Sequence, residues 1–286
     1  MARDQMTLPT SDTLAFGERR FGRVNWLGFW TLFKKEVMRY LKVAAQTIFA
    51  PIITTMLYLT VFLVAFGAGR ETVMDGEVIA FAAFLPPGLI MMAVLSNAFQ
   101  NSSSSLIIGK VQGSIVDVLM PPLSAAELTA AFVLGAATRG LLVGGVTAVT
   151  IGGFMLVTGG PFAVSHLGAV LYFALAASIM LGAVGAIAGM WAEKFDQLAL
   201  ITNFVITPLT FLSGTFYSVR KEGLPEWVAD ISAFNPLFYL IDGFRYGFIG
   251  VSDARVAVGA VISLILSAAL VGITYLLFKR GYKLKA

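Results

Sequence analysis

Long uninterrupted runs of apolar residues dominate the chain, and polar residues gather in the connections between them. A helix needs about 20 predominantly apolar residues to cross the roughly 30 Å hydrocarbon core of a bilayer. Six stretches are long enough: 44–66, 79–99, 125–157, 166–190, 199–219 and 255–278. The pattern therefore predicts an all-α membrane protein with six transmembrane helices.

A seventh apolar stretch, residues 231–250, contains Asn235-Pro236, Asp242 and Arg245. The residue before a proline is disfavoured in a helix, so a helix can restart at Pro236 with Asn235 as its cap. We therefore predict two short helices with a break between them. We interpret residues 220–250 as a re-entrant hairpin, which must be buried in protein or line a water-filled cavity.

The distribution of positive charge predicts the orientation. Eight Lys and Arg residues precede the first span and four follow the last. Positive clusters stay on the cytosolic side, and an even number of crossings puts both termini there. The hairpin is then external. Residues 1–43 are too charged for a secretory signal, so the first span is expected to be an uncleaved anchor.

Composition excludes several kinds of chemistry. The chain is 58% hydrophobic and 13% charged, with no cysteine, one histidine and a net charge of +4. Thiolate catalysis, cysteine-ligated metals and disulfides are therefore ruled out. No basic face suited to nucleic acid is apparent. The nearest approach to a phosphate-binding loop, Gly109-Lys110, fails because position 104 is Ser and Val111 follows the lysine. We expect no enzyme activity, cofactor or metal in this chain.

An amphipathic helix is predicted before the first span. Its apolar face is formed by Trp26, Phe29, Trp30, Phe33, Val37, Tyr40 and Leu41, and Lys34, Lys35, Arg39 and Lys42 take the other face. Such a helix is typical of an anchor at the membrane surface. Alternatively, it is an elbow that transmits the movement of a bound partner into the first span.

The connection between the second and third spans predicts a short two-faced helix at 107–119. The polar run 100–105 offers caps for its start, and Pro121-Pro122 ends it. The apolar stripe is Ile107, Ile108, Val111, Ile115, Val118 and Leu119, with Lys110, Gln112, Ser114 and Asp117 opposite. This helix either lies against the bilayer or is a lever that docks into a partner. The short loop 191–198, with Glu193 and Asp196, is a second candidate contact.

Polar groups inside the predicted spans are few. Arg139 is the one full charge away from the ends of the spans, and it either snorkels, pairs with a carbonyl or helix end, or contacts substrate. The other candidates for lining a route are Asn97, Asn203, Thr207, Thr210 and Ser213. Asp242 and Arg245 are spaced i, i+3 and are expected to pair. Two glycine motifs, Gly140–Gly144 and Gly185–Gly189, suit close helix packing.

Three segments together resemble the permease subunit of ABC-2 type bacterial exporters, in the compact group of unassigned substrate. The run Asn235-Pro-Leu-Phe-Tyr239, followed by Arg245 and Gly250, resembles the family's element before the last span. The run Lys110–Pro122 resembles its cytosolic coupling helix, and residues 84–97 (FLPPGLIMMAVLSN) resemble its second span. The likeness covers residues 26–286 as one transmembrane domain. Residues 1–25 are expected to form a cytosolic tail.

The resemblance implies a half-transporter. Two copies of the chain would form a pathway in the lipid bilayer, and two copies of a separate cytosolic ATPase, which binds ATP and Mg, would drive export of an amphipathic, lipid-linked or drug-like substrate. The ATPase-coupling residues would be Lys110, Val111, Gln112, Ser114, Ile115, Asp117, Val118, Glu193 and Asp196. The pathway or gate candidates would be Asn97, Arg139, Asn203, Thr207, Thr210, Tyr239, Asp242 and Arg245.

The main alternative is a self-contained secondary transporter or channel. That class is expected to show inverted repeats and carboxylates near the membrane midplane, and the predicted spans hold no Asp or Glu there. A membrane enzyme would need clustered Asp, Glu or His, and the sequence lacks such a cluster. A structural assembly factor remains a further alternative.

Overall fold

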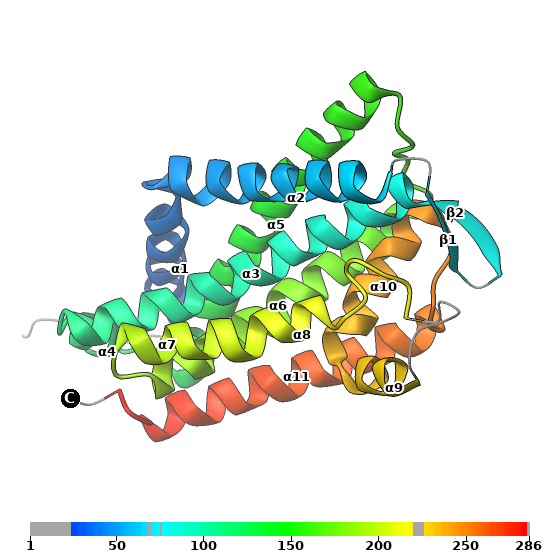
Figure 1. Ribbon diagram of the computed structural model, residues 1–286. Coiled ribbons are helices and arrows are strands. Elements are labelled where there is room, and N and C mark those ends of the chain that lie inside the picture. Colours follow the sequence, from blue (N-terminus) through cyan, green and yellow to red (C-terminus); the bar gives the residue numbers. More distant parts are fainter. Residues whose placement is uncertain (1–23, 68–69, 75, 220–225, 285–286) are drawn as a thin grey trace, which may run out of the picture.

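The computed structural model describes residues 24–67, 70–74, 76–219 and 226–284, which form a bundle of long helices (Figure 1). Most of the predicted tail, residues 1–23, lies outside the described residues. Five helices are long and apolar enough to cross a membrane: Ala45–Phe66 (η1, Ala45–Phe49, and α2, Ala50–Phe66), α3 (Phe81–Val111), α5 (Ala125–Thr158), α6 (Leu167–Trp191) and α11 (Val256–Arg280). These correspond to five of the six predicted spans.

The remaining predicted span, 199–219, corresponds to a shorter helix. The helix runs continuously from Phe195 to Phe211 through α7 (Phe195–Ile201), η2 (Thr202–Ile206) and α8 (Thr207–Phe211). Its 17 residues fall short of the roughly 20 that a bilayer core requires. Six full-length spans are therefore not confirmed among the described residues.

α3 is the most buried of the long helices and packs closely against both α5 and α6. Glycines make this approach possible. A Cβ atom at Gly144 would lie 2.3 Å from Val94 Cγ2, and one at Gly185 would lie 2.3 Å from the Phe99 carbonyl oxygen. Both glycine motifs thus face α3, in agreement with the packing role predicted for them.

Two prolines follow segments of π-helix, in which the hydrogen bonds span five residues. Pro51 comes just after η1, and Pro208 just after η2. A proline cannot donate to the carbonyl four residues back, which would belong to Thr47 or Phe204. Both carbonyls lie within the π segments, so the widened turns accommodate the missing bonds without ending either helix.

The predicted helix at 107–119 is wrong in its boundaries. α3 continues to Val111, and a separate five-residue helix, α4 (Ile115–Leu119), follows. The polar run continues α3 instead of starting a helix: Asn101, Ser102 and Ser103 are buried, and the Ser102 hydroxyl donates to the Gly182 carbonyl of α6 at 2.6 Å. The break falls at Gly113, whose φ of +72° suits glycine.

The predicted break at Asn235-Pro236 is confirmed. α9 (Glu226–Phe234) ends at Asn235, and α10 (Pro236–Ile249) begins with the Asn235 side chain accepting a 3.0 Å hydrogen bond from Leu237 N. α10 packs on α6, α11 and α3.

Sequence reasoning missed a small hairpin of β1 (Glu71–Met74) and β2 (Glu77–Ala80), paired antiparallel before α3.

The predicted amphipathic helix is present as α1 (Trp26–Leu41), which packs on α5. Trp26 and Trp30 are exposed, as an anchor at a membrane surface requires. The buried face is formed by Leu32, Glu36 and Tyr40. The predicted aromatic stripe therefore meets the bundle only in part: Tyr40 is buried and Phe29 and Phe33 pack against the core, whereas Trp26 and Trp30 are exposed.

Candidate functional site

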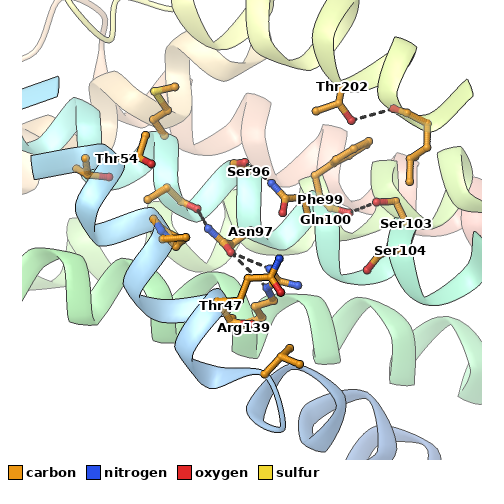
Figure 2. Close-up of a pocket in the computed structure, with 18 of the residues that line it drawn as sticks. Thr47, Thr54, Ser96, Asn97, Phe99, Gln100, Ser103, Ser104, Arg139 and Thr202 are labelled. Atoms are coloured by element: carbon orange, nitrogen blue, oxygen red, sulfur yellow. Dashed lines mark hydrogen bonds between the residues drawn. The ribbon is translucent and has the colours of Figure 1, made fainter. Parts of the chain in front are cut away.

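A cleft of about 590 Å³ opens beside α3, between α2 and the helix 195–211. It is lined by residues of five segments, and Figure 2 shows them as sticks. Its polar lining comprises Arg39, Gln46, Thr47, Thr54, Thr55, Tyr58, Ser96, Asn97, Gln100, Ser103, Ser104, Arg139 and Thr202. This volume lies within the usual range of small-molecule sites.

Two of the predicted pathway residues meet in this cleft. Arg139 of α5 donates to Asn97 Oδ1 of α3 from Nε at 3.3 Å and from Nη2 at 3.1 Å. Asn97 Nδ2 in turn donates to the Ala93 carbonyl at 3.0 Å, which fixes the oxygen toward the guanidinium (Figure 2). Among the described residues, no carboxylate oxygen lies within 4.0 Å of Arg139.

A buried carboxylate next to the cleft was missed by sequence reasoning. Glu36 is fully buried; it accepts a 2.7 Å hydrogen bond from Ser105 and lies 3.3 Å from Arg39 Nη2. Arg39 also donates to Ser104 and to the carbonyl of Asn101. The spacing of Glu36 could have indicated its burial. Glu36 lies four residues from both Leu32 and Tyr40, and the three residues form the buried face of α1.

The other predicted pathway residues lie outside the cleft lining. Asn203 and Thr207 are exposed on the outer side of η2 and α8, and Thr210 is buried with its hydroxyl donating to the Ile206 carbonyl at 2.8 Å. Tyr239 donates to the Ala233 carbonyl at 3.0 Å, within the α9–α10 hairpin. From the helix 195–211, Leu198 and Thr202 reach the cleft.

The predicted ion pair between Asp242 and Arg245 is wrong. Asp242 accepts hydrogen bonds from the backbone N–H groups of Asp253, at 2.8 Å, and Ala254, at 2.9 Å, just before α11. Arg245 donates to the carbonyls of Gly214, at 2.7 Å, and Phe84, at 3.3 Å. Each side chain is hydrogen-bonded to main-chain groups of a different neighbouring segment, and these bonds take the place of the predicted ion pair.

A second candidate surface lies at the end of the bundle that carries α1 and α4. Ile115 and Val118 of α4 are buried in a cluster that contains Leu32, Leu106, Leu128, Phe132, Met190 and Phe278. Val111, Gln112, Val116, Asp117 and Met120 are exposed, and Ser114 is half-buried. A groove of about 310 Å³ between α1 and α4 is lined on one side by Lys35 and on the other by Asp117.

The loop 191–198, predicted as a second contact for a partner, forms an ion pair with the C-terminal segment. Glu193 accepts a 2.7 Å bond from Lys283 Nζ, which lowers the pKa of Glu193 and raises that of Lys283. Asp196 is exposed in the first turn of α7. Lys110 donates to the carbonyls of Met190 and Ala192, so its ammonium joins the end of α3 to the end of α6 instead of facing outward.

A bundle of apolar helices around a polar cleft, with the guanidinium of Arg139 projecting into it from a candidate membrane span, defines an integral membrane protein of the transporter type. Residues 28–249 match the ABC-2 type transporter family, and the chain belongs to it. The inner membrane transport permease YadH of Escherichia coli strain K12 is 33% identical over 262 residues, which cover 91% of this chain and 98% of the relative. Nodulation protein J of Rhizobium leguminosarum bv. viciae is 29% identical over 248 residues, or 82% and 86% of the two chains. The chain is therefore a multi-pass inner membrane transport permease subunit.

Proposed function

We propose that the chain is the membrane half of an ATP-driven exporter, in which two copies form the pathway and a separate cytosolic ATPase supplies the energy. The observation that carries this proposal is the way α4 packs against the bundle. The helix is exposed on one face and embedded on the other, as a lever needs to be.

The embedded face joins α4 to the ends of most long helices. Ile115 and Val118 pack in one cluster with side chains of α1, α3, α5, α6 and α11. Close-packed interiors transmit displacement instead of absorbing it. A push on α4 would therefore move the ends of several helices together, and with them the walls of the cleft.

The exposed face has the composition of a docking surface. Val111, Val116 and Met120 are exposed apolar side chains beside the charge of Asp117. An apolar patch rimmed by polar groups is typical of a protein–protein interface. Ser114, Gln112, Glu193 and Asp196 would form the polar rim, and the bound partner would hold ATP and Mg.

The exposed polar groups of the helix 195–211 favour a second copy. Asn203 and Thr207 are exposed on an apolar helix; the Thr207 hydroxyl donates to the Thr202 carbonyl, whereas the Asn203 amide makes no hydrogen bond within the described residues. Polar side chains are costly against lipid and are usually covered by another helix or by water. Two copies that met across the open side of the cleft would cover them and enclose a pathway. Its largely apolar walls suit an amphipathic, lipid-linked or drug-like substrate.

Affinity purification of the full chain from native membranes tests the division of labour. We expect an ATPase subunit in equal amount. A second experiment places a cysteine at Asn203 of this cysteine-free chain, and we expect a disulfide-linked dimer after mild oxidation. Lys34→Cys on the outer face of α1 is the control and should stay monomeric. Purification without an ATPase, together with no cross-link at position 203, would overturn the proposal.

A further inference from the structure

The cleft holds a cation whose charge is not neutralised. The two guanidinium groups that line it differ in this respect: Arg39 lies 3.3 Å from the carboxylate of Glu36, whereas the partner of Arg139 is the neutral amide of Asn97. Arg139 Nη1 makes no hydrogen bond within the described residues and is not fully buried. The cleft therefore carries an excess positive charge with a free donor.

The rest of the lining fits an anion better than a cation. No Asp or Glu is among the lining residues, while hydroxyl and amide groups such as Thr47, Ser96 and Gln100 line the same cleft (Figure 2). The remaining wall is apolar and includes Val43, Leu89, Met92, Phe99, Ile108 and Leu198. A charge at membrane depth is costly and is usually retained for a function.

We propose that this cleft binds the anionic headgroup, a phosphate or a carboxylate, of an amphipathic ligand, with Arg139 contacting the headgroup. The apolar chain of the ligand lies against the apolar side chains of α3 and against Leu198 of the helix 195–211. Asn97 is a positioning residue, because its oxygen holds the guanidinium by Nε and Nη2 and leaves Nη1 for the ligand. The inference rests on the proposed function only in taking the cleft as part of the transport route.

A fluorescent reporter inside the cleft tests the proposal. Thr54 lines the cleft and the chain has no cysteine, so Thr54→Cys gives a single labelling site. The labelled full chain is placed in phosphatidylcholine nanodiscs and titrated with dodecyl phosphate. Dodecylphosphocholine, which has the same chain but no net charge, and inorganic phosphate are the comparison probes. We expect a saturable response to dodecyl phosphate and a much weaker response to the other two.

Three further variants in the same background separate charge from shape. Arg139→Gln removes the cation, and Asn97→Asp places a carboxylate beside it with almost no change in volume. Each should weaken dodecyl phosphate binding at least about tenfold, because a charge-assisted hydrogen bond is lost or a competing anion is added. Thr150→Ala removes a neutral hydroxyl from the same helix as Arg139, outside the cleft lining, and should leave the affinity unchanged. If Arg139→Gln does not fold, Asn97→Asp decides.

Unchanged affinity in Asn97→Asp and in any folded Arg139→Gln protein overturns the proposal, as does equal binding of dodecylphosphocholine. Inorganic phosphate binding as tightly as dodecyl phosphate would overturn the amphipathic part. Nanodiscs that contain phosphatidylglycerol distinguish the source of the ligand, because competition identifies a bilayer lipid and its absence identifies a transported molecule. The titration needs neither ATPase nor transport, so failure of the proposed ATPase partnership would leave this result intact.

Discussion

Arg245 Nη2 lies 2.7 Å from the carbonyl oxygen of Gly214, a contact that joins α10 to the segment after α8. The same side chain reaches the Phe84 carbonyl of α3, and its guanidinium carbon lies 3.8 Å from the centre of the Phe84 ring. Arg245 is almost completely buried. One residue thus holds three segments together, and it does so through main-chain acceptors instead of the expected carboxylate.

We predict that Arg245→Ala destabilises the fold instead of merely opening a gate. The substitution removes the donor to three carbonyls, those of Phe84, Gly214 and Thr215, and leaves a cavity in a packed region, at a cost of roughly 2–5 kcal/mol. Thermal unfolding of the purified chain in detergent should show a clear loss of stability. Tyr239→Phe, which removes one hydroxyl from the same helix, should cost about 1 kcal/mol or less. A folded Arg245→Ala protein of normal stability that leaks would restore the gate hypothesis.

A second prediction concerns the exposed face of α4. Charge reversal by Asp117→Lys, or a bulky Ser114→Trp, should weaken association of the ATPase severalfold or uncouple hydrolysis from transport, because both residues border the docking face. Membrane insertion should be normal. The measurement is ATPase co-purification together with substrate-stimulated hydrolysis.

The matched control for this pair is Glu77→Lys, the same charge reversal at an exposed position in β2. Glu77→Lys should affect neither readout, because the β1–β2 hairpin precedes α3 whereas α4 follows it, so the two lie at opposite ends of that long helix. Normal association and coupling in both α4 variants would refute the lever interpretation.

Glu36 gives a third prediction. Glu36→Gln keeps the shape but removes the charge that faces Arg39, and leaves a guanidinium without its counter-ion. We expect a loss of about 1–3 kcal/mol in the free energy of unfolding. Lys34→Gln, an exposed charge on the same helix, should change stability by less than about 0.5 kcal/mol. Equal effects of the two substitutions would show that the buried pair contributes nothing.

Local signals in the sequence predicted local features of the fold well. The cap at Asn235 and the helix start at Pro236 follow from backbone sterics within a few residues, and both are confirmed. The two glycine motifs were also recognisable from local sequence, because a four-residue spacing places both glycines on one face of a helix. The continuation of α3 through the polar residues Gln100 to Ser105 was not, because Ser102 and Ser105 find their acceptors on α6 and α1, far away in the sequence.

The candidate site was only partly predictable for the same physical reason. Arg139 and Asn97 stood out singly as polar residues in apolar spans, yet their contact joins positions 42 residues apart. Glu36 sat among surface charges of an amphipathic helix, so its burial depended on which face meets α5. The spacing of Asp242 and Arg245 permitted an ion pair, but neighbouring main-chain groups took both side chains.

The last prediction concerns topology, which the positive charges at both ends imply. Single cysteines at Glu77 and Val164 should react with an impermeant thiol reagent from outside, and cysteines at Gln112, Asp196 and Lys283 only after permeabilisation. Both external positions are exposed, Glu77 in β2 and Val164 in the connection between α5 and α6. The Glu193–Lys283 contact places position 283 beside the loop after α6, so 196 and 283 should behave alike. External labelling at 283 with internal labelling at 112 would mean that the α9–α10 hairpin crosses the membrane and that the chain has an odd number of spans.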